Sequence, residues 1–236
     1  MLALASSGCD LILLSENKSN DTPPLEAGVP ADAPPNLCFG DDFNTPPLNG
    51  ELWQEIADSS TMPAKVEVRQ GALRVTLTAG PSGSSTYRNG VFGKTAFDFT
   101  GATLEVRVRP ANLANPLVET AFVLDVAGTS GTFTMSASAS KLAMKATTAL
   151  PDKIVPYGND FVAWRIRHEP AAKTFVYEVL IQGVGWKEQR RVVADIPTTI
   201  TSVQLYAEAV MNGGNDAEAV FDEVTLFGDS CVQSLR

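Results

Sequence analysis

From Phe39 onward, apolar and polar residues alternate along the chain with a period of two rather than 3.6. Two such runs, Lys65–Arg69 and Ala72–Thr78, are separated by the turn-forming pair Gln70 and Gly71. Alternation of this kind places successive side chains on opposite faces of a half-buried β-strand. The segment ATLEVRVRP repeats it, with Leu104, Val106 and Val108 set against Glu105, Arg107 and Arg109. The pattern predicts a body made of β-strands.

Turn signals divide this body into about eleven or twelve short strands. Glycine-containing turns at Gly128–Gly131 and Gly183–Gly185 each separate two alternating runs. The sequence of the body contains no amphipathic stretch of helical length. Many short strands with regular turns are typical of a sandwich or barrel. We therefore expect an all-β, antiparallel domain over residues 37–236 with little helix.

The first 36 residues have a different composition. Ser7, Gly8 and Cys9 end a run of small and apolar residues and resemble a bacterial lipobox, in which the cysteine is lipidated. Ser6 stands where a lipobox usually has an aliphatic residue, and no basic residue precedes Cys9, so we expect a start upstream of Met1. A buried or unmodified Cys9 is the alternative. The Pro-, Asp- and Asn-rich remainder predicts a disordered tether.

Charge and cysteine usage narrow the partners and the location. A net charge of -9 disfavours nucleic acid as a partner. The chain has no run of eighteen apolar residues, so we expect membrane contact only through a lipid anchor on an exported protein of the bacterial envelope. The three cysteines form no C-x-x-C pair, which gives a zinc site no support. No cofactor is expected, with calcium as the one alternative.

The order of several motifs in the body resembles one family. They are DDF followed by LW, the pattern from Val68 to Val75, LEVRVRP, WRIR, VYEV, the hairpin from Gly183 to Trp186, and VFDEVTLF. Together they are similar to the concanavalin A-like lectins and glucanases, which include laminin-G and pentraxin-like domains, over Phe39 to Gly228. The resemblance implies an antiparallel two-sheet jelly-roll β-sandwich whose first and last strands lie close together. That closeness fits a disulfide between Cys38 and Cys231.

Catalytic residues are not evident in the sequence. If Trp164 and Ile166 face the core, His168 faces it too, while Glu169 points to the opposite face, so the two cannot act as a pair. The resembling glucanases carry their acid and nucleophile on a Glu-x-Asp-x-Glu or Glu-x-Asp-x-x-Glu strand, and this sequence contains no such match.

The nearest acidic group is formed by Asp216, Glu218 and Asp222, which a period of two would place on one face. Phe221 and Val224 cannot both face the core there without a β-bulge, so the shared face is uncertain at this point. The resemblance implies that Asp222 ties down a neighbouring loop. We expect a protein that is not an enzyme.

Candidate binding residues lie in segments predicted to be loops. Two groups combine an aromatic ring with hydrogen-bonding neighbours suited to a sugar, namely Tyr87, Arg88 and Asn89, and Tyr157, Asn159 and Asp160. An acidic loop with Asn212, Asn215 and Asp216 is the candidate calcium site, as is Asp125 with a partner loop. Trp164 and Trp186 occupy core-type positions, whereas Trp53 fits either role.

These observations favour a non-catalytic bacterial envelope lipoprotein whose β-sandwich binds a glycan or an envelope protein. A structural or assembly component of the envelope without a small ligand is the first alternative, and a divergent glycoside hydrolase is the second. The sequence defines no oligomeric state.

Overall fold

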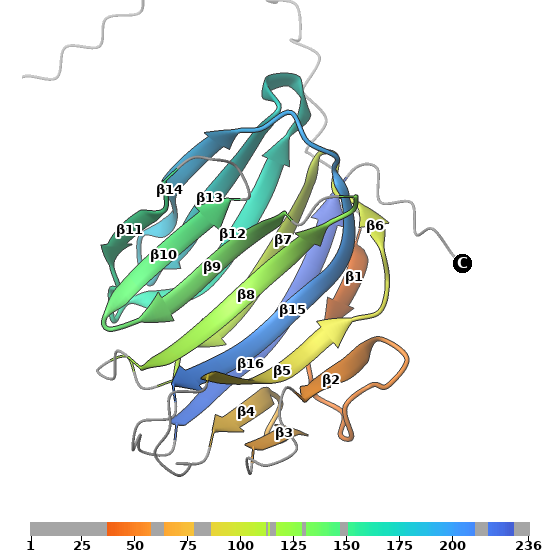
Figure 1. Cartoon of the computed structure of the whole chain (residues 1–236), viewed down its shortest axis with the longest axis vertical. Coiled ribbons are helices and arrows are strands. Elements are labelled where there is room, and N and C mark those ends of the chain that lie inside the picture. Colours follow the sequence, from red (N-terminus) through yellow and green to blue (C-terminus); the bar gives the residue numbers. More distant parts are fainter. Residues whose placement is uncertain are drawn as a thin grey trace, which may run out of the picture. The chain divides into compact units, whose positions relative to one another are not determined.

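The computed structural model describes residues 37–57, 64–77, 86–111, 113, 117–128, 131–146, 151–210 and 217–228. In this part of the chain, two antiparallel β-sheets pack face to face, as Figure 1 shows. The one helical element among these residues is a single 3-10 turn, η1 (Pro170–Ala172). None of the described helices is long and apolar enough to cross a bilayer. The prediction of an antiparallel β-sandwich is confirmed.

Sheet A is the rear sheet in Figure 1, and its strands follow the order β14-β13-β12-β7-β16-β4-β3, with β1 also paired to β16. Their bounds are β1 Leu37–Asp41, β3 Ala64–Val68, β4 Leu73–Leu77, β7 Ala102–Arg109, β12 Phe161–Glu169, β13 Thr174–Ile181, β14 Gly185–Val193 and β16 Ala217–Gly228. Because β1 pairs with β16, the first and last described strands adjoin, as the family resemblance implied.

Sheet B is the front sheet and follows the order β11-β10-β9-β8-β15-β5-β2, with β6 also paired to β15. Its strands are β2 Trp53–Ala57, β5 Thr86–Gly93, β6 Phe97–Asp98, β8 Val118–Val126, β9 Thr132–Ser138, β10 Lys141–Ala146, β11 Lys153–Pro156 and β15 Thr199–Val210. The described residues thus form sixteen strands, more than expected, since segments as short as β6 and β11 are too brief to show alternation.

The core lies between the two sheets and follows the predicted alternation. Leu104, Val106 and Val108 of β7 all face it, each 4% exposed or less. Trp164 and Ile166 of β12 are fully buried in the same core. β8 pairs with β9, and β13 pairs through the turn at 183–185 with β14, so both predicted turns separate paired strands as expected. A strand period of two therefore located the core correctly wherever the strand was regular.

Candidate functional site

The outward face of sheet A is covered by ion pairs. Glu178, 7% exposed, accepts hydrogen bonds from Nε of Arg165 at 2.7 Å and from Nε of Arg167 at 3.2 Å. Burial raises the pKa of the Glu178 carboxyl, but these two guanidinium groups outweigh burial and hold it below its ordinary value. Further ion pairs connect these three residues to Glu105, Glu169, Arg191 and Glu188, and we call the whole network the sheet A ladder. These charges satisfy one another and offer a ligand little.

The sheet A face also contains Trp186, which the sequence placed in the core. The guanidinium carbon of Arg165 lies 4.1 Å from the centroid of its ring, and Trp186 is only partly buried. A register shift between Tyr177 and Glu178 inserts one extra residue into β14, which turns Trp186 to the outer face. The core prediction for Trp186 is therefore wrong, whereas Trp164 and Trp53 are both buried in the core.

His168 is a structural residue of β12. It is 7% exposed, packs against Phe175 and accepts a hydrogen bond at Nδ1 from the Gly101 amide at 3.2 Å. Burial lowers the pKa of its imidazole and favours the neutral form. Glu169 points to the opposite face and pairs there with Arg167. The expected separation of His168 from Glu169 is confirmed.

The acidic motif of the last strand does not form a carboxylate cluster among the described residues. Glu218 is held by Arg74, with Nη1 2.6 Å from Oε2. A bulge resolves the open question of parity, because the pairing of β16 with β7 shifts between Phe221 and Glu223 and so lets both Phe221 and Val224 face the core. Asp222 is the extra residue and is exposed, without a hydrogen bond or ion pair in the described structure, so it does not tie down a loop there. Asp216 lies outside the described residues.

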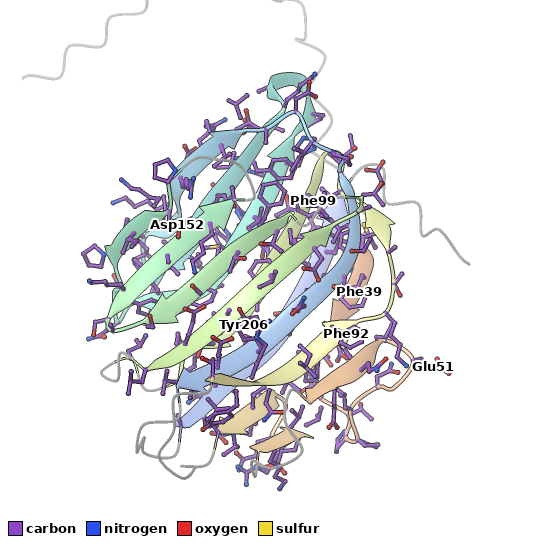
Figure 2. All side chains as sticks on the ribbon, viewed as in Figure 1. Phe39, Glu51, Phe92, Phe99, Asp152 and Tyr206 are labelled. Atoms are coloured by element: carbon purple, nitrogen blue, oxygen red, sulfur yellow. The ribbon has the colours of Figure 1, made fainter. Side chains whose placement is uncertain are left out.

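The outward face of sheet B has a different character, and we call it the sheet B face. One transverse row across it runs through the paired residues Gln54, Phe92, Gln204, Val123, Thr134 and Lys145. Phe92 is partly exposed and lies between the amide side chains of Gln54 and Gln204. Figure 2 labels Phe92 on the sheet nearer to the viewer. An aromatic ring flanked by amides suits a ligand that has both apolar and hydroxyl-bearing surfaces.

Asp125 lies beside this row and holds one of its amide side chains. Its carboxylate accepts hydrogen bonds from Nε2 of Gln204 at 2.6 Å and from the Ser202 hydroxyl. These contacts fix the Gln204 amide and leave its oxygen as an acceptor. The Gln204 side chain is therefore held in place before a ligand arrives, which reduces the entropy cost of ordering it on binding.

A second row beside the first is centred on Tyr206, which Figure 2 also labels on this face. The Arg88 guanidinium lies 4.1 Å from the ring centroid and is itself paired with Glu208 at 2.8 Å. Burial raises the pKa of Tyr206 to about 12, so its hydroxyl stays protonated at neutral pH. A Cβ at Gly90 would lie 2.6 Å from Cα of Tyr206, so glycine is required for this close packing.

The structure does not bring the three residues of the first predicted sugar-binding group together on one surface. Tyr87 does not lie in a loop, because it belongs to β5, is 6% exposed and packs in the core. The Gly- and Ser-rich sequence before it led to the loop prediction. Arg88 does reach the sheet B face, next to Tyr206. Asn89 has the same strand parity as the core residue Val91 and so faces inward.

The second group keeps its loop position between β11 and β12. Tyr157 packs against Phe161 and Trp164, and burial raises the pKa of its hydroxyl to about 12. Asn159 and Asp160 are both exposed. Tyr157 and Asn159 line a cavity together, whereas Asp160 does not belong to its lining.

The calcium prediction falls mainly on residues that the structure does not describe. Asn212, Asn215 and Asp216 lie outside the described residues, and Asp125 is bound by Ser202 and Gln204. Within the described ranges, no three His, Cys, Asp or Glu side chains converge as metal ligands.

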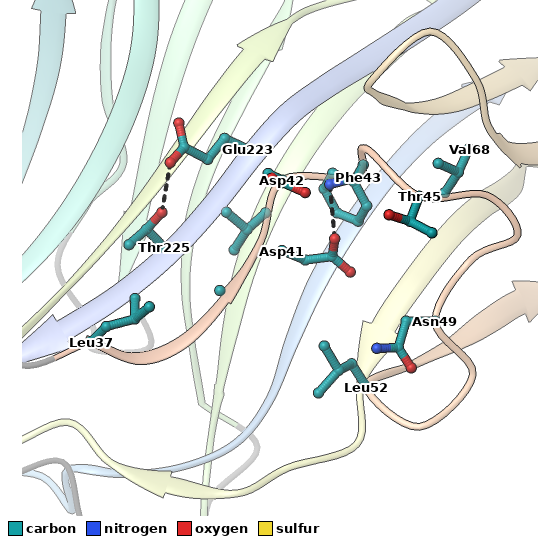
Figure 3. Close-up of a pocket in the computed structure, with 12 residues that line it drawn as sticks. Leu37, Asp41, Asp42, Phe43, Thr45, Asn49, Leu52, Val68, Glu223 and Thr225 are labelled. Atoms are coloured by element: carbon teal, nitrogen blue, oxygen red, sulfur yellow. Dashed lines mark hydrogen bonds between the residues drawn. The ribbon is translucent and has the colours of Figure 1, made fainter.

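An acidic cavity of about 480 Å³ beside β1 has its carboxylates already engaged (Figure 3). Asp41 accepts hydrogen bonds from the Phe43 amide and from Nε1 of Trp53, both at 2.8 Å. Backbone and side-chain hydrogen bonds from Asn44 lower the pKa of the neighbouring Asp42 carboxyl. These bonds tie the segment after β1 to the core and give Asp41 a structural role.

Sequence reasoning missed Phe92, Gln54 and Gln204 because they come from three separate strands. One local signal was available, since Val91 and Phe92 are adjacent in a strand and only one of them can face the core. An aromatic residue at an outward position is such a signal.

No protein-family model matches the sequence, and no curated protein matches it. Solved structures do match. One comes from the endo-acting O-glycanases with which gut bacteria initiate mucin breakdown, at 16% identity and TM-score 0.62, covering 83% of this chain and 100% of that one. Another is an immunostimulatory antigen and pseudo β-1,3-glucanase of Mycobacterium tuberculosis, at 17% identity and TM-score 0.60, covering 82% and 99%.

A third match is the lectin UEA-II in complex with galactose, at 13% identity and TM-score 0.57, covering 84% of this chain and 100% of the lectin. At these identities the likeness establishes the fold alone. The described domain has the concanavalin A-like jelly-roll fold, which both lectins and glycoside hydrolases adopt.

Proposed function

We propose that this protein is a non-catalytic carbohydrate-binding domain of a lipid-anchored bacterial envelope protein, and that the sheet B face is its binding surface. The observation that carries the proposal is the row in which Gln54, Phe92 and Gln204 are direct neighbours on three strands. Solved structures with the same fold include a lectin bound to galactose and proteins that cleave glycans, which supports a carbohydrate ligand.

The chemistry of the row fits a neutral sugar. The partly exposed ring of Phe92 provides an apolar platform, while the amides of Gln54 and Gln204 offer donors and acceptors to hydroxyl groups. Thr134 adds a hydroxyl further along the same row. A few fixed polar groups around an apolar surface are the usual composition of a small-molecule site.

Glycan-array binding by the purified domain tests this proposal. We expect binding to a limited set of glycans, and loss of that binding in Phe92→Ala. Val193→Ala is the matched control, because Val193 is 69% exposed on β14 at the edge of sheet A. A domain that binds no glycan on the array would favour the structural or assembly role instead.

A divergent glycoside hydrolase is the second candidate, and one observation favours it. Glu119 and Glu208 are directly paired across β8 and β15 on the sheet B face. Directly opposed strand residues have Cβ atoms about 4.5–5.5 Å apart, and retaining glycosidases separate their carboxyl groups by about 5–5.5 Å. Against it, Glu208 is held by both Nε and Nη2 of Arg88. An ion-paired carboxylate is a poor acid or nucleophile.

Reducing-sugar release from the glycans bound on the array separates the two candidates. We expect no release above the buffer control. Release that disappears in Glu119→Gln and in Glu208→Gln would establish the hydrolase and contradict the non-catalytic role.

The anchor and the disulfide are further parts of the proposal, since Cys9 and Cys231 lie outside the described residues. Pairing of Cys38 with Cys231 is supported by the pairing of Leu37 with Phe227 in the two terminal strands, which brings Cys38 next to the end of the last strand. Lipidation of Cys9 is supported by the small residues before it and by the polar segment after it.

Intact-mass analysis after thiol labelling tests both modifications in the exported protein. We expect acyl chains on Cys9 and no labelled thiol. Cys9→Ala should leave the membrane fraction while staying folded, whereas Cys38→Ala should stay anchored and unfold at a temperature several degrees lower. Unmodified Cys9 in the membrane fraction would contradict the anchor, and label on Cys38 or Cys231 would contradict the disulfide.

A further inference from the structure

A second cavity opens at the end of β7 in sheet A, away from the sheet B face. The two neighbours of β7 are β12 and β16, and each has a register shift beside the end of β7. The shifts release Val162 and Asp222 from regular pairing, and both line the cavity. β-Bulges often re-aim side chains next to functional sites. The cavity has a volume of about 360 Å³, within the usual size range of small-ligand sites.

Arg109 is the cation of this cavity, and its guanidinium is not engaged. Each of the other arginines in the described ranges has an ion pair or a hydrogen bond: Arg69, Arg74, Arg88, Arg107, Arg165, Arg167, Arg190 and Arg191. Arg109 is exposed and has neither with any residue of the described structure. On a sheet face where arginines are otherwise neutralised by glutamates, an arginine beside a cavity is available to a ligand.

Two further polar side chains line the cavity. Asp222 is exposed and, like Arg109, has no hydrogen bond or ion pair in the described structure. The two opposite charges share one cavity without approaching within ion-pair distance of each other. Asn159 is exposed and contributes an amide with both donors and an acceptor.

The remaining wall is apolar and packs against the core. Val108 is 4% exposed, and Leu113 and Phe161 pack against the core. The ring of Phe161 lies 5.2 Å from that of Tyr157, which in turn lies edge-on to Trp164 at 6.2 Å. These ring contacts place Phe161 at the apolar wall of the cavity and Tyr157 between Phe161 and the core residue Trp164.

We propose that this cavity binds an acidic sugar of the hexuronate class. Its carboxylate pairs with Arg109, since a guanidinium matches a carboxylate with two parallel hydrogen bonds. Its hydroxyl groups donate to the Asp222 carboxylate and exchange hydrogen bonds with the Asn159 amide. The apolar face of the sugar ring packs against Phe161. The site is separate from the sheet B face and does not depend on the function proposed there.

An NMR titration of the ¹⁵N-labelled domain tests the proposal, with D-glucuronate, D-glucose and propionate as probes at matched ionic strength. We expect saturable shifts of the Arg109, Phe161 and Val162 amides with glucuronate, and at least tenfold weaker binding of glucose and propionate. Arg109→Gln should weaken glucuronate binding by about tenfold or more. Asp222→Ala should weaken it by about threefold or more.

Arg107→Gln is the matched control. Arg107 precedes Arg109 by two residues on the same strand and face, but it pairs with Glu223 and does not line the cavity. We expect its affinity for glucuronate to stay within about twofold of the wild type. Equal affinity for glucose would contradict the carboxylate assignment, and equal affinity for propionate would contradict the sugar assignment. Shifts confined to the sheet B face, or unchanged binding in a folded Arg109→Gln, would overturn the site.

Discussion

The outward faces of sheets A and B are both built from antiparallel strands, yet they carry different chemistry. On sheet A, arginines and glutamates alternate across strands and neutralise one another, with Glu178 at the centre. On the sheet B face, the central rows are mostly neutral and combine Phe92 and Tyr206 with amides and hydroxyls. The comparison teaches that outward polarity alone does not identify a binding face. What distinguishes the proposed binding face is that the Gln54 amide and the side-chain oxygen of Gln204 have no hydrogen-bond partner in the described structure.

The largest effect is expected where the sheet A ladder is broken at its most buried member. Replacing Glu178 with alanine leaves Arg165 and Arg167 without the carboxylate that both contact, and their side chains are only 18% and 30% exposed. We expect a loss of about 2–4 kcal/mol in the free energy of unfolding. In a domain of this size, that corresponds to a fall in melting temperature of about 5–10 °C.

Glu188→Ala is the control for that measurement, because Glu188 belongs to the same ladder with a side chain 42% exposed. It should cost at most about 0.5 kcal/mol. If thermal unfolding shows that both variants lose the same small amount of unfolding free energy, the sheet A ladder does not stabilise the fold.

Phe92→Ala gives the next largest effect, on the other face. Removing the ring takes away the apolar platform between Gln54 and Gln204, so we expect glycan affinity to fall by about tenfold or more. Because Phe92 is outward-facing and partly exposed, the variant should fold with a melting temperature close to the wild type. Calorimetric titration with a glycan from the array measures the change, and Glu178→Gln tested in parallel should bind normally. Normal glycan binding by Phe92→Ala together with weak binding by Glu178→Gln would place the glycan on the outward face of sheet A instead.

The smallest expected effect is the change with pH in the stability that Glu178 contributes to the folded domain. Glu178 has a folded-state pKa below its ordinary value of 4.5, so its charged form favours the folded state. Its contribution is complete above that value and is lost as the pH falls through the lower folded-state pKa. The stability difference between the wild type and Glu178→Gln should therefore narrow as the pH falls below about 4.5. Denaturant unfolding at a series of pH values measures it, and a difference that stays constant down to pH 3 would contradict the ion-pair account.

The sequence predicted those features that depend on local alternation. Trp164, Ile166 and His168 are alternate residues in the part of β12 that follows its register shift, and all three face the core as expected. A bulge near Asp222 could also be inferred, because a regular strand would place the apolar residues Phe221 and Val224 on opposite faces. Where a bulge left no local conflict, as in β14, Trp186 was assigned to the wrong face.

The candidate sites depend on pairing between distant strands, which a single sequence does not contain. Phe92 and its two amide neighbours become adjacent only through the registers of β2, β5 and β15. Tyr157 and Asn159 were identified in the sequence as an aromatic residue close to an amide. Arg109 and Asp222 are far from them in the sequence and line the same cavity only because of the fold. Local patterns therefore located individual groups, and the sheet topology determined which of them meet.

The most direct test of the central claim is a crystal structure of the domain with a glycan identified on the array. We predict electron density for the sugar on the sheet B face, with the ring of Phe92 against the sugar and with Gln54 or Gln204 hydrogen-bonded to its hydroxyl groups. A neutral sugar bound instead on the ion-paired face of sheet A, with Phe92 free of contact, would contradict the account.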